Sequence, residues 1–136
     1  MINYHYETEF QLKDEQSFSD WISRVISDEE CSEGEINYIF CDDDYLLKIN
    51  QDYLNHDTYT DIISFDYSVG KTLQGDVFIS VERVKENSGK FNTDFDKELQ
   101  RVMVHGILHY CGYKDKDSED QKIMRSKEDH YISLMG

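Results

Sequence analysis

The side chains best suited to chemistry in this sequence lie between His105 and Asp115, in the run His-Gly-Ile-Leu-His-Tyr-Cys-Gly-Tyr-Lys-Asp. Two histidines four residues apart on a helix, here His105 and His109, project from one face and can bind one metal ion. Gly112 can end the helix and turn the chain, so that Asp115 returns toward the same ion. Two imidazoles and one carboxylate leave coordination positions open, which suits a hydrolytic metal better than a structural one.

Two further side chains near this run compete for the metal. Asp117 is an alternative to Asp115 as the third ligand, although the spacing favours Asp115 and places Asp117 better as the cap of a following helix. Cys111 lies only two residues after His109, so we expect its thiol to point away from the ion and into the core. A structural alternative is that both histidines are buried and hydrogen-bonded to the backbone.

The offsets of the two histidines and the glycine match the metzincin protease motif H-E-x-x-H-x-x-G-x-x-H. Position 106 is a glycine here, where those proteases carry the glutamate that activates water. The position of the third ligand holds Asp115. The missing glutamate argues against peptide hydrolysis, and a zincin-like metallopeptidase is kept only as an alternative function.

Length and composition predict one domain over residues 1–136. The chain is long enough for one hydrophobic core, and it contains no proline and no Gly/Ser-rich linker. Its N-terminus does not resemble a signal peptide, and no apolar run approaches the ~20 residues that span a bilayer. The cysteines, Cys31, Cys41 and Cys111, show no CxxC spacing, which favours free thiols in a reducing compartment. We therefore expect a cytoplasmic protein without a membrane partner.

The charge distribution is uneven along the chain. Residues 97–127 carry seven basic and five acidic side chains, a net charge of +2, which leaves −17 on the remainder of a chain whose total is −15. The total charge disfavours nucleic acid, because phosphate neutralisation dominates that kind of binding. The basic side chains around the proposed metal site modify this argument, although an ordinary mixed-charge helical surface is the simpler interpretation.

Hydrophobic periodicity predicts an α+β fold with a small mixed β-sheet of about four strands packed with helices. The expected elements are a strand over 2–6, a helix around 18–26, a strand over 35–41, a helix opening at 42–44, strands over 59–67 and 75–81 joined by a turn near Gly70, and helices over 80–87, from 95, and over 117–134.

Two capping motifs and one buried helix refine this prediction. Ser17 with Asp20 forms a capping box, and Thr93 with Asp96 marks the start of a later helix. The helix that begins near Phe95 is apolar on most sides, which indicates a buried central helix. Its C-terminal end carries the metzincin-like metal site.

Several segments together are similar to one known family. They are His-Gly-x-Leu-His-x-x-Gly-Tyr at 105–113, the stretch 50–65 with Thr60-Asp61 and Ser64-Phe65, Gly-Asp-Val-Phe-Ile-Ser at 75–80, and Met124-Arg125 followed by Glu128. This combination, covering roughly residues 36–130, resembles the YbeY family of bacterial endoribonucleases and rRNA maturation factors.

The resemblance implies a zinc-dependent, single-strand endoribonuclease with one zinc ion per chain, held by three side chains that correspond to His105, His109 and Asp115. It implies a role in 3′-end maturation of small-subunit (16S) rRNA and in ribosome quality control. The implied partners are RNA and, with it, ribosomal proteins or the small ribosomal subunit, and DNA is not expected.

Three positions depart from the family pattern. The usual third ligand is a histidine where this chain has Asp115, and a carboxylate oxygen binds zinc at a similar distance. Tyr59 replaces a proline. Leu54 replaces an arginine that is linked to catalysis in the family, so the cation that stabilises the phosphate must come from elsewhere.

Two residues are candidates for that missing cation. Arg101 lies one turn before His105 on the same helix face, and its alternative role is a surface arginine paired with an acid such as Glu98. His56, near the replaced position, is the second candidate. Both are predicted catalytic residues.

The predicted mechanism is metal-assisted cleavage of an RNA phosphodiester, with positive charge near the transition state. Lys114 and Lys116 flank Asp115 and can bind the RNA backbone, or they are simply solvated loop lysines. No side chain stands out as a general base, so water on the metal or the 2′-hydroxyl of the RNA would have to serve. A third possible function is a non-catalytic, zinc-containing ribosome assembly factor.

Overall fold

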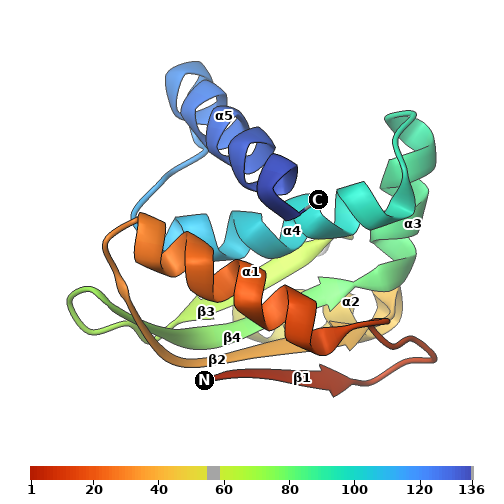
Figure 1. Cartoon of the computed structure of the whole chain (residues 1–136). Coiled ribbons are helices and arrows are strands. Elements are labelled where there is room, and N and C mark those ends of the chain that lie inside the picture. The colour runs from red at the N-terminus through yellow and green to blue at the C-terminus, as the bar shows by residue number, and fades with distance from the viewer. Residues whose placement is uncertain (55–58, 136) are drawn as a thin grey trace.

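The architecture is a four-stranded sheet with five helices in the parts of the chain that the structure, a computed structural model, describes, which are residues 1–54 and 59–135 (Figure 1). The elements are, in order, β1 (Ile2–Tyr6), α1 (Glu15–Asp28), β2 (Ser32–Cys41), α2 (Asp43–Leu54), β3 (Ile62–Asp66), β4 (Thr72–Ser80), α3 (Val81–Lys90), α4 (Phe95–Tyr110) and α5 (Ser118–Met135). This confirms the predicted α+β class and the mixed sheet.

The strands are arranged in the order β1-β2-β4-β3. β1, β2 and β4 run parallel to one another, whereas β3 runs antiparallel to β4 and forms one edge of the sheet. Phe40 of β2 pairs with Tyr6 on one side and Ile79 on the other. A tight turn with Gly70 in a left-handed conformation connects β3 to β4, as the sequence predicted.

The alternation of side chains along the strands gives each face of the sheet its own helices. Ile36, Tyr38 and Phe40 point to the face covered by α1 and α4 and are fully buried in the main core. Cys41 points to the opposite face, where it packs with Leu46 of α2 in a smaller cluster. Figure 1 shows α1 and α4 together on one side of the sheet, with α5 lying above α4.

The helix α4 is the centre of the main core, as its apolar sequence predicted. It contacts the sheet, α1, α3 and α5. Its backbone is also tied to the sheet, because the Tyr38 hydroxyl donates a hydrogen bond of 2.8 Å to the Met103 carbonyl. The buried side chains of α4 include Leu99, Val102, Met103, Val104, Ile107 and Leu108. A helix held on so many sides is a rigid support for groups at its C-terminal end.

Both predicted capping motifs were wrong. The N-cap of α1 is Asp14, whose carboxylate accepts hydrogen bonds from the backbone N–H and the hydroxyl of Ser17, so the helix begins one turn earlier than expected. Short polar residues cluster around this helix start, and several of them can act as a cap. The N-cap of α4 is Asp94 in an extended conformation, without a hydrogen bond from its side chain, rather than Thr93.

No helix in the described part of the chain is long and apolar enough to cross a membrane.

Candidate metal centre

The C-terminal end of α4 brings the two histidines together as their spacing predicted. The Nε2 atoms of His105 and His109 are 3.0 Å apart, and both side chains are partly buried. α4 ends at Tyr110 with Cys111 as its C-cap, and Gly112 follows with φ +106°, a conformation that glycine adopts without strain. The Tyr113 N–H then donates to the Leu108 carbonyl at 3.0 Å, which turns the chain back along the helix.

This turn places Asp115 against both imidazoles. Its Oδ2 atom lies 3.3 Å from Nε2 of His105 and 3.4 Å from Nε2 of His109. Four donors at 2.0–2.1 Å from a tetrahedral zinc ion are separated from one another by about 3.3–3.4 Å. The three donor atoms of this cluster therefore have separations that fit one such ion. Asp115 is 44% exposed, so the open side of the cluster faces solvent, where substrate can approach.

Glu128 of α5 was not singled out as a site residue by the sequence. Its Oε2 atom lies 2.7 Å from Nδ1 of His105, and its side chain is 6% exposed. Because a carboxylate only accepts hydrogen bonds, His105 donates through Nδ1 and presents Nε2 to the cluster. The signal in the sequence was that Glu128 lies on the same face of α5 as Met124 and Tyr131, where a charged residue is unexpected.

The local charges also change the proton affinity of His105. Burial acts to lower the pKa of this imidazole, but the hydrogen bond and charge of Glu128, followed by the charge of Asp115, outweigh it and leave the pKa raised. These anions stabilise positive charge at the centre of the cluster, and a metal cation there has the same sign.

Arg101 lies near His105 but is held by α5. Its guanidinium donates to Glu128 Oε1 at 2.9 Å and to Asp129 Oδ1 at 2.7 Å, and its side chain is 24% exposed. The alternative role predicted for Arg101, pairing with an acid, is therefore confirmed, but the acids are those of α5 rather than Glu98. Arg101 lines the same cavity as His105, so it stays a candidate for a contact with phosphate.

The other predicted site residues lie around the cluster or beyond the described chain. Lys114 and Lys116 are exposed on either side of Asp115, and their contact with an RNA backbone stays a prediction. His56 lies outside the described residues. Leu54, at the end of α2, is 44% exposed and offers no cation.

The two competing ligands have other roles in the structure. The carboxylate of Asp117 accepts the Asp120 N–H at 2.8 Å and so caps α5, as the sequence predicted. The Cys111 thiol packs against the core beside Cys31, with 4.0 Å between the sulfur atoms, and takes no part in the metal cluster. All three cysteines are free.

A second set of contacts holds the loop that carries Asp115. Glu29, at the end of α1, accepts hydrogen bonds from the Tyr113 hydroxyl at 2.6 Å, from Lys127 at 3.0 Å and from the Tyr131 hydroxyl. Burial acts to raise the pKa of Glu29, but these three donors together leave the pKa below its ordinary value. Glu29 thus joins α1 and α5 to the loop two residues before Asp115.

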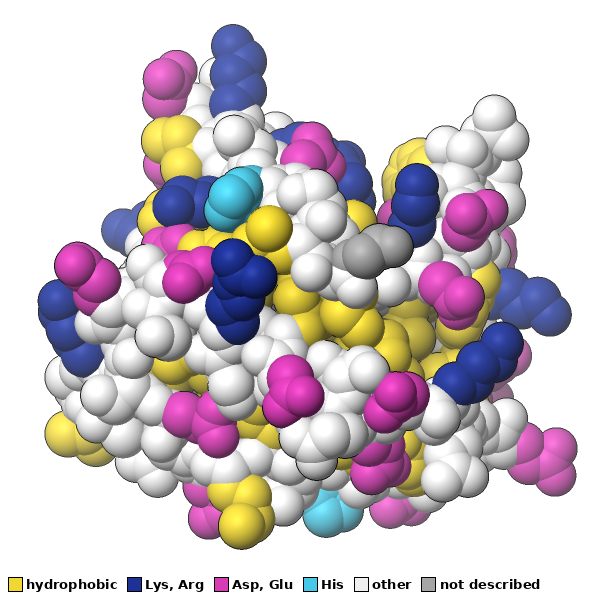
Figure 2. All heavy atoms as spheres, in the orientation of Figure 1, with side chains coloured by type: hydrophobic (Ala, Val, Ile, Leu, Met, Phe, Trp, Pro, Cys, Tyr) yellow, Lys and Arg dark blue, Asp and Glu magenta, His cyan; other side chains and the backbone are white. Residues whose placement is uncertain are grey.

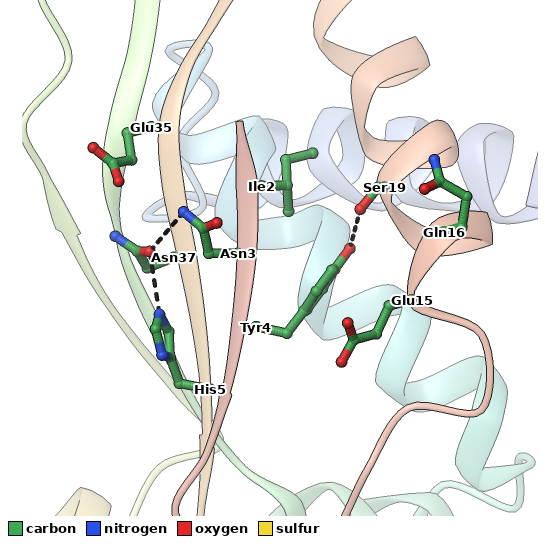
Figure 3. A pocket seen from close by; sticks show the side chains of 9 residues that line it. All are labelled: Ile2, Asn3, Tyr4, His5, Glu15, Gln16, Ser19, Glu35 and Asn37. Carbon is green, nitrogen blue, oxygen red and sulfur yellow. Dashed lines mark hydrogen bonds between the residues drawn. The ribbon is translucent and has the colours of Figure 1, made fainter.

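Two further cavities lie away from the cluster, and neither contains a group of metal-binding side chains among the described residues. One, of about 630 Å³, is an open groove beside the edge strand β1 (Figure 3). In this groove Tyr4 is hydrogen-bonded to Ser19, and Asn37 is hydrogen-bonded to Asn3 and His5. The other, of about 480 Å³, is lined by apolar side chains that include those of Phe10, Phe95, Leu99 and Met135. Figure 2 shows hydrophobic side chains gathered in the middle of the face that carries α1.

The chain is similar to known proteins over almost its whole length. The chain matches the family model described as Endoribonuclease YbeY over residues 2–136. Proteins of that name from Flavobacterium johnsoniae and Flavobacterium psychrophilum are 65% and 60% identical to it, and each alignment covers 98% of this chain and 96% of the relative. A third, from Cytophaga hutchinsonii, is 46% identical over 94% of this chain and 90% of its own length.

A solved structure has a similar fold. The solution structure of TM1509 from Thermotoga maritima matches with a TM-score of 0.70 and 25% sequence identity, covering 99% of this chain and 89% of that protein. The match therefore extends over the sheet and its helices as well as the histidine motif.

Proposed function

The chain belongs to the YbeY family of endoribonucleases, and from this premise we propose that it is a zinc-dependent enzyme that cleaves single-stranded RNA. Its proposed role is in the 3′-end maturation of small-subunit (16S) rRNA and in ribosome quality control, in the cytoplasm. The observation that carries the proposal is the convergence of His105, His109 and Asp115 at the end of α4, with donor separations of 3.0–3.4 Å.

The donor set supports zinc as the metal. Imidazole nitrogens and a carboxylate oxygen are ordinary zinc ligands, and three protein ligands with one open position are typical of catalytic zinc sites. Zinc bound there would supply Lewis acidity toward a phosphoryl oxygen and would acidify water. We propose one ion per chain, because the described residues contain one such cluster.

The protein's own residues orient this site. Glu128 fixes the tautomer and ring direction of His105, and the Glu29–Tyr113 hydrogen bond holds the loop from which Asp115 reaches the histidines. Lys114 and Lys116 are placed to bind the phosphates on either side of the cleaved bond. These local cations allow an acidic protein to bind RNA at one place on its surface.

A zincin-like peptidase is disfavoured by the environment of Gly106. A Cβ atom at this position would lie 3.3 Å from both Ile62 and Val77, so position 106 faces the sheet rather than the metal cluster. A glutamate at this position would have to displace these two side chains and would start from the face of α4 that packs on the sheet. The membership of the chain in an endoribonuclease family points the same way.

A non-catalytic assembly factor is the second candidate function, and two observations favour it. Leu54 stands where the family has its arginine, and Arg101, the nearest substitute, is engaged by two carboxylates of α5. If no other side chain supplies a cation to the phosphate, the zinc serves only to fix the end of α4 and the loop that follows it.

Metal analysis combined with an RNA cleavage assay tests the proposal. We expect the purified protein to hold about one zinc ion per chain and to cut an RNA that carries the 3′ end of a 16S rRNA precursor. His109→Ala should lose both properties, whereas His130→Ala, which removes an exposed histidine of α5, should keep both. A protein that holds zinc and co-sediments with small ribosomal subunits, yet cuts no RNA, would instead establish the assembly-factor function.

A further inference from the structure

A cavity of about 310 Å³ lies beside the metal cluster, between α4, α5 and the turn that connects α3 to α4. His105 and Asp115, two residues of the metal cluster, form one side of it. Phe91, Glu98, Val102 and Arg125 are among its other lining residues. Whatever occupies this cavity is therefore adjacent to the place where the RNA is cut.

Glu98 is a buried acid without a hydrogen-bond donor. Its side chain belongs to the same face of α4 as Val102 and His105, and only 6% of the residue is exposed. In the described parts of the chain no N–H or O–H group donates to its carboxylate, and burial raises its pKa. The Glu98 carboxylate lines the cavity and is not among the fully buried polar atoms of the described residues, so its oxygens are accessible to a ligand in the cavity that supplies a donor.

The rim of the cavity has the two groups that bind single-stranded RNA. Phe91, which follows α3, is 62% exposed although it is a large aromatic residue, and a ring in this position can stack on a nucleobase. The Arg125 side chain is also 62% exposed and lies 3.9 Å from Glu128, its one ion-pair partner in the described residues. In contrast to Arg101, Arg125 is free to turn toward a phosphate.

We propose that this cavity is a subsite for one nucleobase of the RNA, next to the cleaved phosphate; the proposal rests on the endoribonuclease function proposed above. The base stacks on Phe91, its N–H edge donates to Glu98, and the adjoining phosphate binds Arg125 at the rim. Arg101 pairs with the carboxylates of Glu128 and Asp129, which weakens their repulsion of this phosphate. Asp61 is the remaining acid of the cavity lining besides Glu98 and Asp115, and Arg125 has to offset its charge.

The chemistry of Glu98 also predicts which base is preferred. Guanine presents two adjacent donors, N1–H and the exocyclic amino group, which together match the two oxygens of a carboxylate. Adenine and cytosine each present one exocyclic amino group. Uracil presents a single N–H between two carbonyl oxygens, which a carboxylate repels. The subsite should therefore favour guanine most and uracil least.

Equilibrium binding to short RNA analogues, which a gel shows to be intact after each measurement, tests this subsite independently of catalysis. The probes are two short, fluorescein-labelled 2′-O-methyl oligonucleotides, one entirely of uridine and one with a single central guanosine. Anisotropy is measured with the zinc-loaded protein and again in the presence of a chelator. We expect the guanosine probe to bind about 5- to 150-fold more tightly, the discrimination that a good bidentate pair gives.

Variants separate the three contacts. Glu98→Gln should reduce the preference for guanosine to within about twofold while the protein stays folded, because the amide has the same size. Phe91→Ala should weaken both probes, and Phe91→Tyr should restore them. Arg125→Met should reduce the slope of log affinity against log salt by about 0.7, the value for one phosphate of a single strand. Arg24→Met, which removes an arginine of similar exposure from α1, is the matched control and should change none of these values.

The outcomes distinguish this proposal from the proposed function. Equal affinity of the wild-type protein for the two probes, or an unchanged preference in Glu98→Gln, would overturn the subsite even if the enzyme cuts rRNA normally. If the protein prefers the guanosine probe but cuts no RNA, the result supports the subsite and contradicts the endoribonuclease function. The subsite would also be overturned if the wild-type protein binds both probes weakly and the Phe91→Ala and Arg125→Met variants bind them with the same affinity.

Discussion

The carboxylate of Glu128 in α5 lies 2.7 Å from Nδ1 of His105 in α4, so one helix sets the orientation of a proposed metal ligand on another. Glu128→Gln keeps the size of the side chain but removes its charge and weakens this hydrogen bond. We expect zinc affinity to fall about 10- to 100-fold, the usual effect of losing a group that orients a ligand. Competition with a chromophoric chelator measures this loss.

The matched control for this prediction is Glu119→Gln, which neutralises an exposed acid in the first turn of the same helix. Its zinc affinity should equal that of the wild type, because Glu119 belongs to neither the cluster nor the cavity beside it. Equal zinc affinities for Glu128→Gln and Glu119→Gln would show that Glu128 does not orient His105.

Asp115 and Asp117 give opposite predictions although they are two residues apart. Asp115→Ala removes a proposed ligand. Its zinc affinity should fall by more than about 100-fold, the largest loss expected for a residue that only orients a ligand. Asp117→Ala removes the cap of α5 and should cost about 1 kcal/mol of unfolding free energy, with zinc content unchanged. Zinc analysis and urea unfolding of the two variants check both statements, and an Asp115→Ala protein with full zinc content would refute the ligand assignment.

Glu29 predicts a dependence of stability on pH. Its folded pKa lies below its ordinary value of 4.5, so its contribution to stability is fully present above that pH and is lost as the pH falls through the folded pKa. Glu29→Gln should lower the free energy of unfolding by about 1–3 kcal/mol at pH 7, because charged hydrogen bonds are lost. Urea unfolding at pH 7 and at pH 3 measures the effect, and the difference between variant and wild type should shrink at the lower pH. A difference that is the same at both pH values would contradict the prediction.

Gly75 of β4 lies where the strand packs closely against Tyr110 of α4 and the backbone of β3. A Cβ atom at this position would overlap the Phe65 carbonyl oxygen and the Tyr110 hydroxyl, which are themselves hydrogen-bonded at 2.9 Å. Gly75→Ala should therefore lower the free energy of unfolding by about 1–3 kcal/mol. Gly89→Ala, in α3 with nothing nearby, should be neutral or stabilising by up to about 1 kcal/mol. Thermal and urea unfolding compare the two, and equal stabilities would show that β4 and α4 can separate at no cost.

Local patterns in the sequence were sufficient to predict most of the fold. The periodicity of the segment from Phe95 to Tyr110 indicated a buried helix, and the alternation in β1 indicated a strand, because both patterns reflect burial directly. The strand β2 was predicted from its run of residues that favour strands. Helix starts were predicted less well. Near Asp14 and Asp94 several short polar residues can act as the cap, and tertiary contacts decide between them.

In the candidate site, too, the local features were predicted from the sequence and those that depend on tertiary contacts were not. His105, His109 and Asp115 are close in the sequence, so their spacing alone predicts that they meet. Glu128 and Glu29 are far from the motif along the chain, and their contacts depend on how α5 and α1 pack. A charged residue on an otherwise apolar helix face, as at Glu128, is the signal from which such a partner can be found.

The proposed ligands all lie within eleven consecutive residues, whereas the groups that orient them come from 23 residues away at Glu128 and 84 residues away at Glu29. Bringing the ligands together closes only a short loop, which costs little chain entropy, so this segment can gather around an ion early in folding. Full affinity requires α1 and α5 to be docked as well. The strength of the proposed zinc binding should therefore report whether the whole chain has reached its native state, although neither Glu128 nor Glu29 belongs to the proposed ligand set.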